Sequence, residues 1–212
     1  MMTLTALALA ALAAPPVVPD AHQATAFTAY GLRAQVYGDA LRAWERATER
    51  HQTRSAVLTV IDYSLPSATP RLWVVNLSSN ELLFHERVAH GKRSGWDRMT
   101  SWSNTVDSLQ SSIGVSVTAE TYYGKHGLSL RLDGLEPSFN ANNRERDIVM
   151  HGATYVSADF AAAHGRVGNS WGCPAVGAQV APRLIHAIEG GTLLVAWYPD
   201  EGWRSRSAFV KP

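Results

Sequence analysis

Hydrophobic residues recur at helical spacing in two parts of the chain. In residues 36–52 the apolar positions fall on one side of a helix and charged positions such as Glu45 and Glu49 on the other. The apolar positions are Val36, Ala40, Leu41, Trp44 and Ala47. A similar stripe over residues 180–189 stops at Gly190-Gly191, and residues 157–163 have a shorter helical pattern. We therefore predict an amphipathic helix packed on the domain, and two short helices much later in the chain.

Most of the remaining pattern is typical of β-strands. Seven short runs are rich in β-branched and aromatic residues, namely residues 56–63, 71–77, 82–88, 114–119, 128–132, 147–150 and 192–198. Ser78-Ser79-Asn80 has the composition of a hairpin turn between the second and third runs, and residues 66–70 link the first two. The pattern predicts a mainly β fold, either a sandwich or a barrel, preceded by an N-terminal helix.

Two segments do not fit strands joined by short turns. Residues 91–112, here called the polar loop, are too long and too polar for an ordinary hairpin connection, and we expect them to cover a site. Residues 150–176 contain His151-Gly152 and, further on, Asn169-Ser170-Trp171-Gly172-Cys173-Pro174-Ala175. We expect the chemistry of the protein to lie in this second segment.

Composition narrows the class of protein. With 212 residues, 46% of them hydrophobic and 17% charged, the chain is expected to form one folded domain with a short appendage. The net charge of +1 and the lack of a basic run argue against nucleic acid or an anionic membrane as partner. Cys173 is the single cysteine, which excludes an internal disulfide and any site built from several cysteines.

The first residues have the pattern of an export signal. Residues 4–14 form an apolar run that is shorter than the about 20 residues a membrane-spanning helix needs, and small residues around Ala13 suit a signal peptidase. Met1-Met2-Thr3 supplies no positive charge before the run, which leaves a packed or frayed terminal helix as the alternative. We predict a signal peptide over residues 1–14, and a mature protein that is exported without membrane insertion.

His151 and Cys173 are the candidate catalytic pair. His151 follows the apolar run Ile148-Val149-Met150, so it is expected at the end of a strand, and Cys173 lies between Gly172 and Pro174 on a stiff turn. A histidine within hydrogen-bond reach would generate the thiolate, and N–H groups near Gly172 would face an oxyanion. Only the fold can bring together residues that are 22 positions apart.

Other interpretations of these residues stay open at this point. A lone cysteine is often a small buried residue of the core, and a lone histidine often has a structural role. No pair of histidines has the spacing of a zinc site, so no metal or other cofactor is expected. Ser170 lacks the G-x-S-x-G setting of a serine hydrolase nucleophile.

The motif resembles that of the murein L,D-transpeptidases, cysteine enzymes of mainly β fold that crosslink bacterial peptidoglycan. The resemblance rests on His151-Gly152 followed by Ser170-x-Gly172-Cys173-Pro174-Ala175, and it extends over residues 55–199. Further segments that are similar to this family are residues 63–67, 71–77, 89–92, 108–112, 120–127 and 131–136. The resemblance implies the L,D-transpeptidase β-sandwich, with residues 15–54 as an N-terminal extension and residues 200–212 as a C-terminal tail.

The resemblance also implies roles for individual residues. Cys173 would be the nucleophile and His151 the base, oriented by the carbonyl of Gly152, with Gly172 and Ser170 as small orienting residues beside the thiol. The implied substrate-binding residues are Tyr122, Tyr123, His126 and Arg131, with Lys125, Arg144, Arg146 and Arg166 as further cations for substrate carboxylates. Trp171 and Ala175 depart from the commoner motif, which has His before the Gly-Cys pair and Arg or Asn two residues after the cysteine.

The activity implied by the resemblance is acyl transfer on peptidoglycan stem tetrapeptides, in the periplasm or cell wall, by a monomer. Cys173 would release D-Ala and form a thioester, and carbapenems would acylate the same thiol. The alternatives are an L,D-carboxypeptidase that uses water as acceptor, and a non-catalytic peptidoglycan-binding module. A sortase-like transpeptidase also uses a cysteine and a histidine, but it needs an essential arginine after the cysteine. It is disfavoured because Arg183, which follows Cys173, lies in a predicted helix.

Overall fold

The computed structural model describes residues 27–212. Within these residues the chain forms eight β-strands, four α-helices and one 3-10 helix. The strands are β1 (Val57–Asp62), β2 (Leu72–Asn76), β3 (Glu81–Glu86), β4 (Gly114–Gly124), β5 (Gly127–Gly134), β6 (Val149–Ala153), β7 (Ala175–Gly177) and β8 (Leu193–Trp197). The helices are α2 (Ala34–Glu49), η1 (Ala141–Asn143), α3 (Ala158–His164), α4 (Ala181–Ile188) and α5 (Glu201–Arg206).

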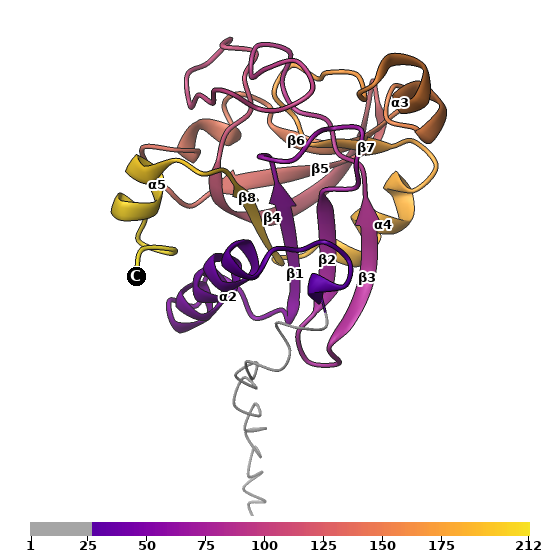
Figure 1. Cartoon of the computed structure of the whole chain (residues 1–212). Coiled ribbons are helices and arrows are strands. Elements are labelled where there is room, and N and C mark those ends of the chain that lie inside the picture. Colours follow the sequence, from indigo (N-terminus) through magenta and orange to yellow (C-terminus); the bar gives the residue numbers. More distant parts are fainter. Residues whose placement is uncertain (1–26) are drawn as a thin grey trace, which may run out of the picture.

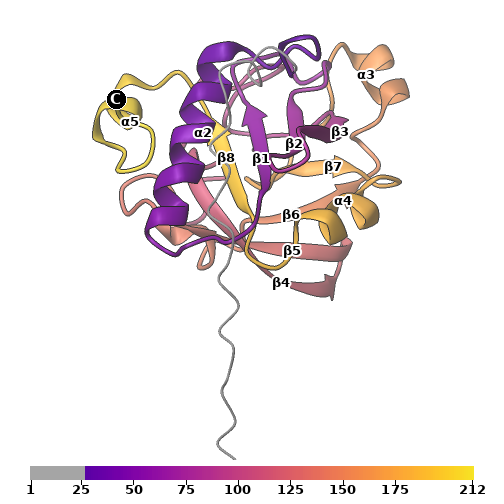
Figure 2. The same cartoon turned by 90° about the horizontal axis from the view of Figure 1, so that it is seen from below.

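The strands form one sheet that nearly closes on itself. Its order is β3-β2-β1-β8-β4-β5-β6-β7. At its two edges, Val88 just after β3 forms an antiparallel bridge to Val176 of β7, and the N–H of Ala89 donates to the carbonyl of Ala175 at 2.8 Å. In Figures 1 and 2, β1 to β3 run across the direction of β5 and β6, so that the sheet folds into two layers around the core.

The most deeply buried strands lie at the middle of the sheet. β1 pairs in parallel with β8, with Leu58 opposite Leu193, and all five residues of β8 are buried. Strands that are covered on both faces read as nearly continuous apolar runs, which explains why β8 is composed of Leu193-Leu194-Val195-Ala196-Trp197. This pairing joins the first strand in the sequence, β1, to the last, β8.

Helix α2 packs against β1 and β8 with one apolar face. Its buried residues include Val36, Ala40, Trp44 and Ala47, as the spacing predicted, whereas Leu41 is only half-buried. Arg33, just before the helix, donates to the buried carboxylate of Asp62 at 2.7 and 2.9 Å, which ties the start of α2 to the end of β1. The helix is therefore part of the domain's core.

The mainly β fold with an N-terminal helix is confirmed, as are the seven predicted strands and three predicted helices. The structure adds β7, η1 and α5, and β4 extends five residues beyond its predicted end at residue 119. The hairpin between β2 and β3 turns at Asn80, whose φ is 54°.

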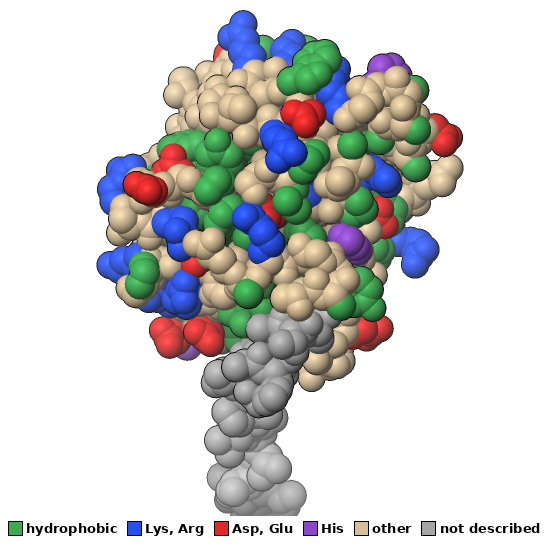
Figure 3. Space-filling model, viewed as in Figure 1, with side chains coloured by type: hydrophobic (Ala, Val, Ile, Leu, Met, Phe, Trp, Pro, Cys, Tyr) green, Lys and Arg blue, Asp and Glu red, His purple; other side chains and the backbone are tan. Residues whose placement is uncertain are grey.

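The predicted signal peptide over residues 1–14, with its cleavage site near Ala13, lies outside the described residues. Among residues 27–212 there is no helix with the length and hydrophobicity that a membrane crossing requires. On the face drawn in Figure 3, basic and acidic side chains are interspersed with apolar ones.

Candidate active site

The side chain of Ser170 fixes the turn that carries Cys173. Its Oγ donates to the carbonyl of Cys173 at 2.6 Å and accepts from the N–H of Gly172 at 3.1 Å. Gly172 has a φ of 135°, and a Cβ at this position would lie 2.8 Å from the carbonyl oxygen of Gln110. Glycine is therefore required both by the backbone angle and by the space. The result is a rigid turn directly before the cysteine.

The peptide bond between Gly172 and Cys173 has a defined orientation. The Oγ of Ser111 donates to the carbonyl of Gly172 at 3.0 Å. In a trans peptide the C=O and N–H groups point in opposite directions, so the N–H of Cys173 points away from Ser111. Within residues 27–212 this N–H has no hydrogen-bond acceptor, whereas the N–H of Gly172 is already bonded to Ser170. The N–H of Cys173 is thus free to donate to an oxyanion beside the sulfur.

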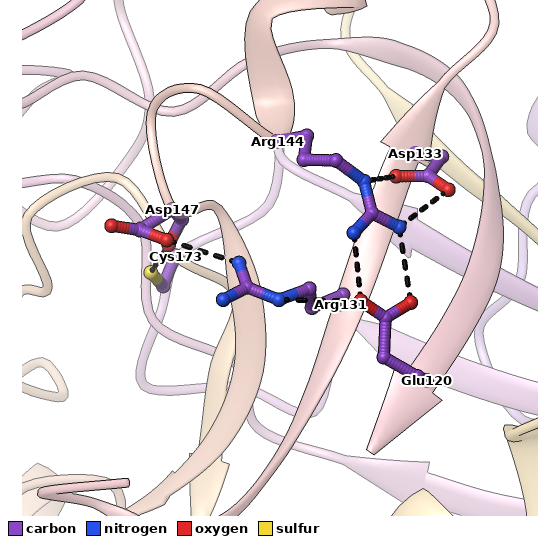
Figure 4. Close-up of polar contacts among 6 residues, drawn as sticks. All are labelled: Glu120, Arg131, Asp133, Arg144, Asp147 and Cys173. Atoms are coloured by element: carbon purple, nitrogen blue, oxygen red, sulfur yellow. Dashed lines mark hydrogen bonds and ion pairs between the residues drawn. The ribbon is translucent and has the colours of Figure 1, made fainter. Parts of the chain in front are cut away.

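The thiol of Cys173 is half-buried. Its Sγ donates to the carbonyl oxygen of Asp147 at 3.4 Å, as Figure 4 shows. Burial raises the pKa of the thiol, and the N–H of Val149 and the positive charges of Arg146 and Lys125 act in the opposite direction without cancelling it. The thiol is therefore protonated at neutral pH, and a base is needed to make it a nucleophile.

His151 lies on β6, beside the segment that carries the thiol. β6 pairs in parallel with β7, and His151 is opposite Ala175, two residues after Cys173. On its other side β6 pairs with β5, where Ser129 is opposite His151. The fold thus brings two residues that are far apart in sequence onto adjacent segments.

The imidazole of His151 is held in one tautomer. Its Nδ1 lies 2.9 Å from the carbonyl oxygen of Gly152, and because a carbonyl only accepts, Nδ1 carries the proton and Nε2 the lone pair. This is the contact that the family resemblance implies. The ring stacks on that of His126 at a centroid distance of 4.2 Å, and burial lowers the pKa of His151. A neutral ring with a free Nε2 lone pair is a general base at neutral pH.

The polar loop is fastened to the cysteine turn near its two ends and to Arg146 in between. Gly91 forms a parallel bridge to Ser170, and the N–H of Lys92 donates to the carbonyl of Ser170 at 2.8 Å. Arg146, which precedes β6, donates to four groups of the loop: the carbonyls of Ser103 and Gln110 and the hydroxyls of Ser108 and Ser112. In Figure 1 the loop lies above β6 and β7, on the side of the molecule away from α2.

A buried cation supports the start of the polar loop. Arg71 is fully buried and donates to the carbonyls of Val88 and Leu65 and to Nδ1 of His90. Because the guanidinium only donates, Nδ1 of His90 is the acceptor, and Nε2 carries the proton towards the carbonyl of Gly95 at 3.3 Å. Burial and the charge of Arg71 lower the pKa of His90 to about 4. His90 is therefore neutral at neutral pH.

The four predicted substrate-binding residues have different surroundings. His126 stacks on His151, and Tyr123 is strongly exposed. Tyr122 lies under the guanidinium of Arg131, which is 4.8 Å from the ring centroid. Arg131 also pairs with Asp147 at 3.0 Å and Glu120 at 3.5 Å, in the network of Figure 4 that continues through Arg144 to Asp133. Arg131 is therefore engaged by carboxylates of the protein itself.

Sequence reasoning gave no role to Ser111, His90 or Lys92. Ser111 and Lys92 belong to the polar loop, and their partners Gly172 and Ser170 follow about 60 to 80 residues later. The only signal for these residues in the sequence is the similarity of residues 89–92 and 108–112 to the family. Among the described residues no group of three or more histidine, cysteine or acidic side chains is arranged to hold a metal ion.

Comparison with known protein families gives a match that covers most of the chain. A family model described as the L,D-transpeptidase catalytic domain matches residues 28–197. A comparison with curated protein sequences finds no match.

Three solved structures are similar to this chain at low identity. An L,D-transpeptidase from Mycobacterium smegmatis is 13% identical, with a TM-score of 0.44 over 68% of this chain and 59% of that one. The L,D-transpeptidase LdtMt1, solved in complex with imipenem, is 16% identical, with a TM-score of 0.41 over 66% of this chain and 58% of that one. An L,D-transpeptidase from Stackebrandtia nassauensis is 14% identical, with a TM-score of 0.40 over 76% and 67%. This chain thus spans less than two thirds of the first two.

Proposed function

The chain belongs to the L,D-transpeptidase catalytic domain family, and from this premise we propose that it is a cysteine acyltransferase acting on the stem tetrapeptides of peptidoglycan. The observation that carries the proposal is the pairing of β6 with β7, which sets the neutral, carbonyl-oriented ring of His151 beside the turn of Cys173. The thiol needs the imidazole as a base because burial raises the pKa of the thiol.

In the first half of the proposed reaction, Nε2 of His151 removes the proton of the thiol as Sγ attacks the carbonyl carbon of diaminopimelate. The resulting oxyanion accepts from the free N–H of Cys173. When the carbon–nitrogen bond to D-Ala breaks, the imidazolium gives its proton to the leaving amine. The products are free D-Ala and a thioester on Cys173.

In the second half, an acceptor resolves the thioester. An amine of a neighbouring stem peptide loses a proton to His151 and attacks the carbonyl, and the thiol is regenerated with a new peptide bond. If water replaces the amine, the same site acts as an L,D-carboxypeptidase. Gly172, Ser170 and Gly152 act here as orienting residues, since their contacts fix the cysteine turn and the imidazole.

We further propose that the protein acts outside the cytoplasmic membrane, in the periplasm or cell wall, as a monomer with stem peptides as its partner. The support for this is the family to which the chain belongs and the apolar run of residues 4–14.

The test is incubation of the mature protein with a purified disaccharide tetrapeptide, with products identified by mass. We expect loss of D-Ala and, with an acceptor stem, a crosslinked dimer; hydrolysis alone would identify the carboxypeptidase.

Cys173→Ala and His151→Ala should each lower turnover by several orders of magnitude, and the double variant should be little worse, because the two residues act as one unit. His164→Ala, which changes an exposed histidine on α3, is the control. Binding without turnover would favour the non-catalytic module.

A further inference from the structure

Trp171 is an exposed aromatic side chain two residues before the candidate nucleophile. Its exposed fraction is 68%, which is unusual for a tryptophan in a domain of this size. Two ammonium groups approach its ring: Nζ of Lys92 lies 5.0 Å from the ring centroid and Nζ of Lys125 5.4 Å. The sequence contains only three lysines, so two of the three converge on this one indole.

The positive charges of Lys92 and Lys125 are not neutralised by the protein. Within residues 27–212 neither lysine forms an ion pair with a carboxylate. The arginines nearby differ, because Arg131 and Arg144 pair with acidic side chains and Arg146 binds four acceptors of the polar loop. The two lysines therefore differ from Arg131 and Arg144, which are paired with carboxylates, and from Arg146, whose donors are occupied by the polar loop.

The backbone segments that carry the three side chains are held at a fixed position relative to the candidate pair. Lys92 is in register with the cysteine turn, because its N–H donates to the carbonyl of Ser170, and the N–H of Ser170 donates to His90. Lys125 and His126 form the two-residue turn between β4 and β5, and His126 stacks on His151. The same hairpin turn thus contacts Trp171 through one residue and the imidazole through the next.

We propose that Trp171, Lys92 and Lys125 form a subsite for a carboxylate of the acyl-donor peptide. The inference rests on the proposed function. It adds a contact to a part of the substrate that lies outside the reacting atoms. The indole face supports a peptide plane or methylene group, and the ammonium groups meet the negative charge. Lysine suits this role because its three donors can rotate to a ligand while its stem stays on the ring.

Two carboxylates of a stem tetrapeptide lie on the residues joined by the bond that breaks, and these are the ones within reach of a subsite beside the thiol. One is the C-terminal carboxylate of D-Ala, and the other is the side carboxylate of diaminopimelate. The chemistry of recognition is the same for both, so peptides that carry an amide at one or the other position distinguish them.

Binding to Cys173→Ala protein tests the subsite without turnover. In this background we expect Lys92→Gln to raise the Kd for the disaccharide tetrapeptide about fivefold, since an exposed charge pair contributes up to about 1 kcal/mol. Trp171→Leu should also weaken binding several-fold, and because the ring is exposed this variant should fold normally. Lys211→Gln, which changes the remaining lysine far along the chain, is the matched control and should bind as the parent does.

The amidated peptides complete the experiment. The peptide that lacks the recognised carboxylate should bind the parent and the Lys92→Gln protein equally, whereas the other peptide should keep the fivefold difference. The subsite is overturned if Lys92→Gln binds the unmodified peptide as tightly as the parent, if both amides keep the difference, or if the parent does not bind the peptide at all. Lysine-dependent binding together with no turnover by the wild-type protein would overturn the proposed function and leave the subsite standing.

Discussion

At residue 151 a buried imidazole keeps a lone pair on one ring nitrogen. Burial alone removes water from the imidazole and lowers its pKa, and the bond from Nδ1 to the carbonyl of Gly152 then fixes which nitrogen keeps a lone pair. A carbonyl can do this in place of the aspartate of a serine hydrolase because only the tautomer and orientation must be set. In the proposed mechanism the thiol, whose pKa is raised, depends on that nitrogen.

The pH dependence of acylation follows from these two shifts. With a carbapenem as probe, the rate of adduct formation should rise with pH with a midpoint below 6.5, because the lowered pKa keeps His151 neutral further into the acid range. In His151→Ala the rise should move to alkaline pH, where the thiol ionises without a base. Intact mass measures the adduct, and Cys173 can form at most one. Identical profiles for the two proteins would contradict the paired mechanism.

His90 gives a second pH effect, on stability. Its pKa is about 4 in the folded protein and near the ordinary 6.5 in the unfolded chain, so between these values the unfolded chain binds more protons. The free energy of unfolding should therefore fall as pH decreases from about 6.5 to about 4, by up to about 1.4 kcal/mol per unit from this group. Urea unfolding of His90→Gln should show a flatter dependence, whereas exposed His164→Gln should follow the wild type.

At the scale of elements, the polar loop is a structured part of the site. Arg146 satisfies two carbonyls and two hydroxyls of a segment that has no strand or helix of its own. Ser111 of the same loop orients the peptide before Cys173. Long segments without regular structure must satisfy their polar groups individually, and here one guanidinium satisfies four of them.

Loosening this fastening should show in proteolysis. Arg146→Met should make the polar loop the first site of cleavage under native conditions, because four of the bonds that hold residues 103–112 are lost at once. Arg144→Met is the matched control, as its guanidinium pairs only with Glu120 and Asp133 outside the loop. Limited digestion followed by mass measurement locates the cut, and equal cleavage of the two variants would assign the loop's order to other contacts.

The elements that the sequence predicted are those with a strong hydrophobic period. β1, β8 and α2 bury a full face, so their pattern is clear. β7 has only three residues and begins at the last residue of the motif, Ala175. α5 is a six-residue helix of Glu201-Gly202-Trp203-Arg204-Ser205-Arg206. Both are too short for a hydrophobic period to emerge. For the site, His151 and Cys173 stand out by residue type, whereas Ser111 is one serine among many and acquires a role only through a partner 61 residues away.

At the scale of the molecule, the hydrophobic core includes both ends of the described chain. Phe27 near its start and Trp203, Phe209 and Val210 near its end belong to the same buried cluster. Arg46 of α2 donates to the carbonyls of Phe209 and Lys211, which holds the last residues against the helix. The residues expected to form a tail after the catalytic domain thus contribute to its interior.

This packing predicts a large effect on stability far from the site. Trp203→Ala should lower the free energy of unfolding by about 3–5 kcal/mol, because the fully buried indole leaves a cavity and its Nε1 no longer donates to the buried carboxylate of Glu136. Trp96→Ala, which removes a tryptophan that is 70% exposed, is the control. Urea unfolding measures both, and a small loss for Trp203→Ala would show that residues 200–212 are indeed an accessory tail.

The parallel pairing of β1 with β8 also determines when the molecule can fold. Leu58 meets Leu193, so the middle of the sheet is completed only after nearly the whole chain has been synthesised. The chain between β1 and β8 must be brought into a closed loop before the pairing of these two strands contributes any stability. Folding is therefore expected to be slow, in the range of milliseconds to seconds that is usual for proteins rich in distant contacts. The cysteine turn joins an edge of that sheet, and we therefore expect the candidate nucleophile to reach its final position only as one of the last events of folding.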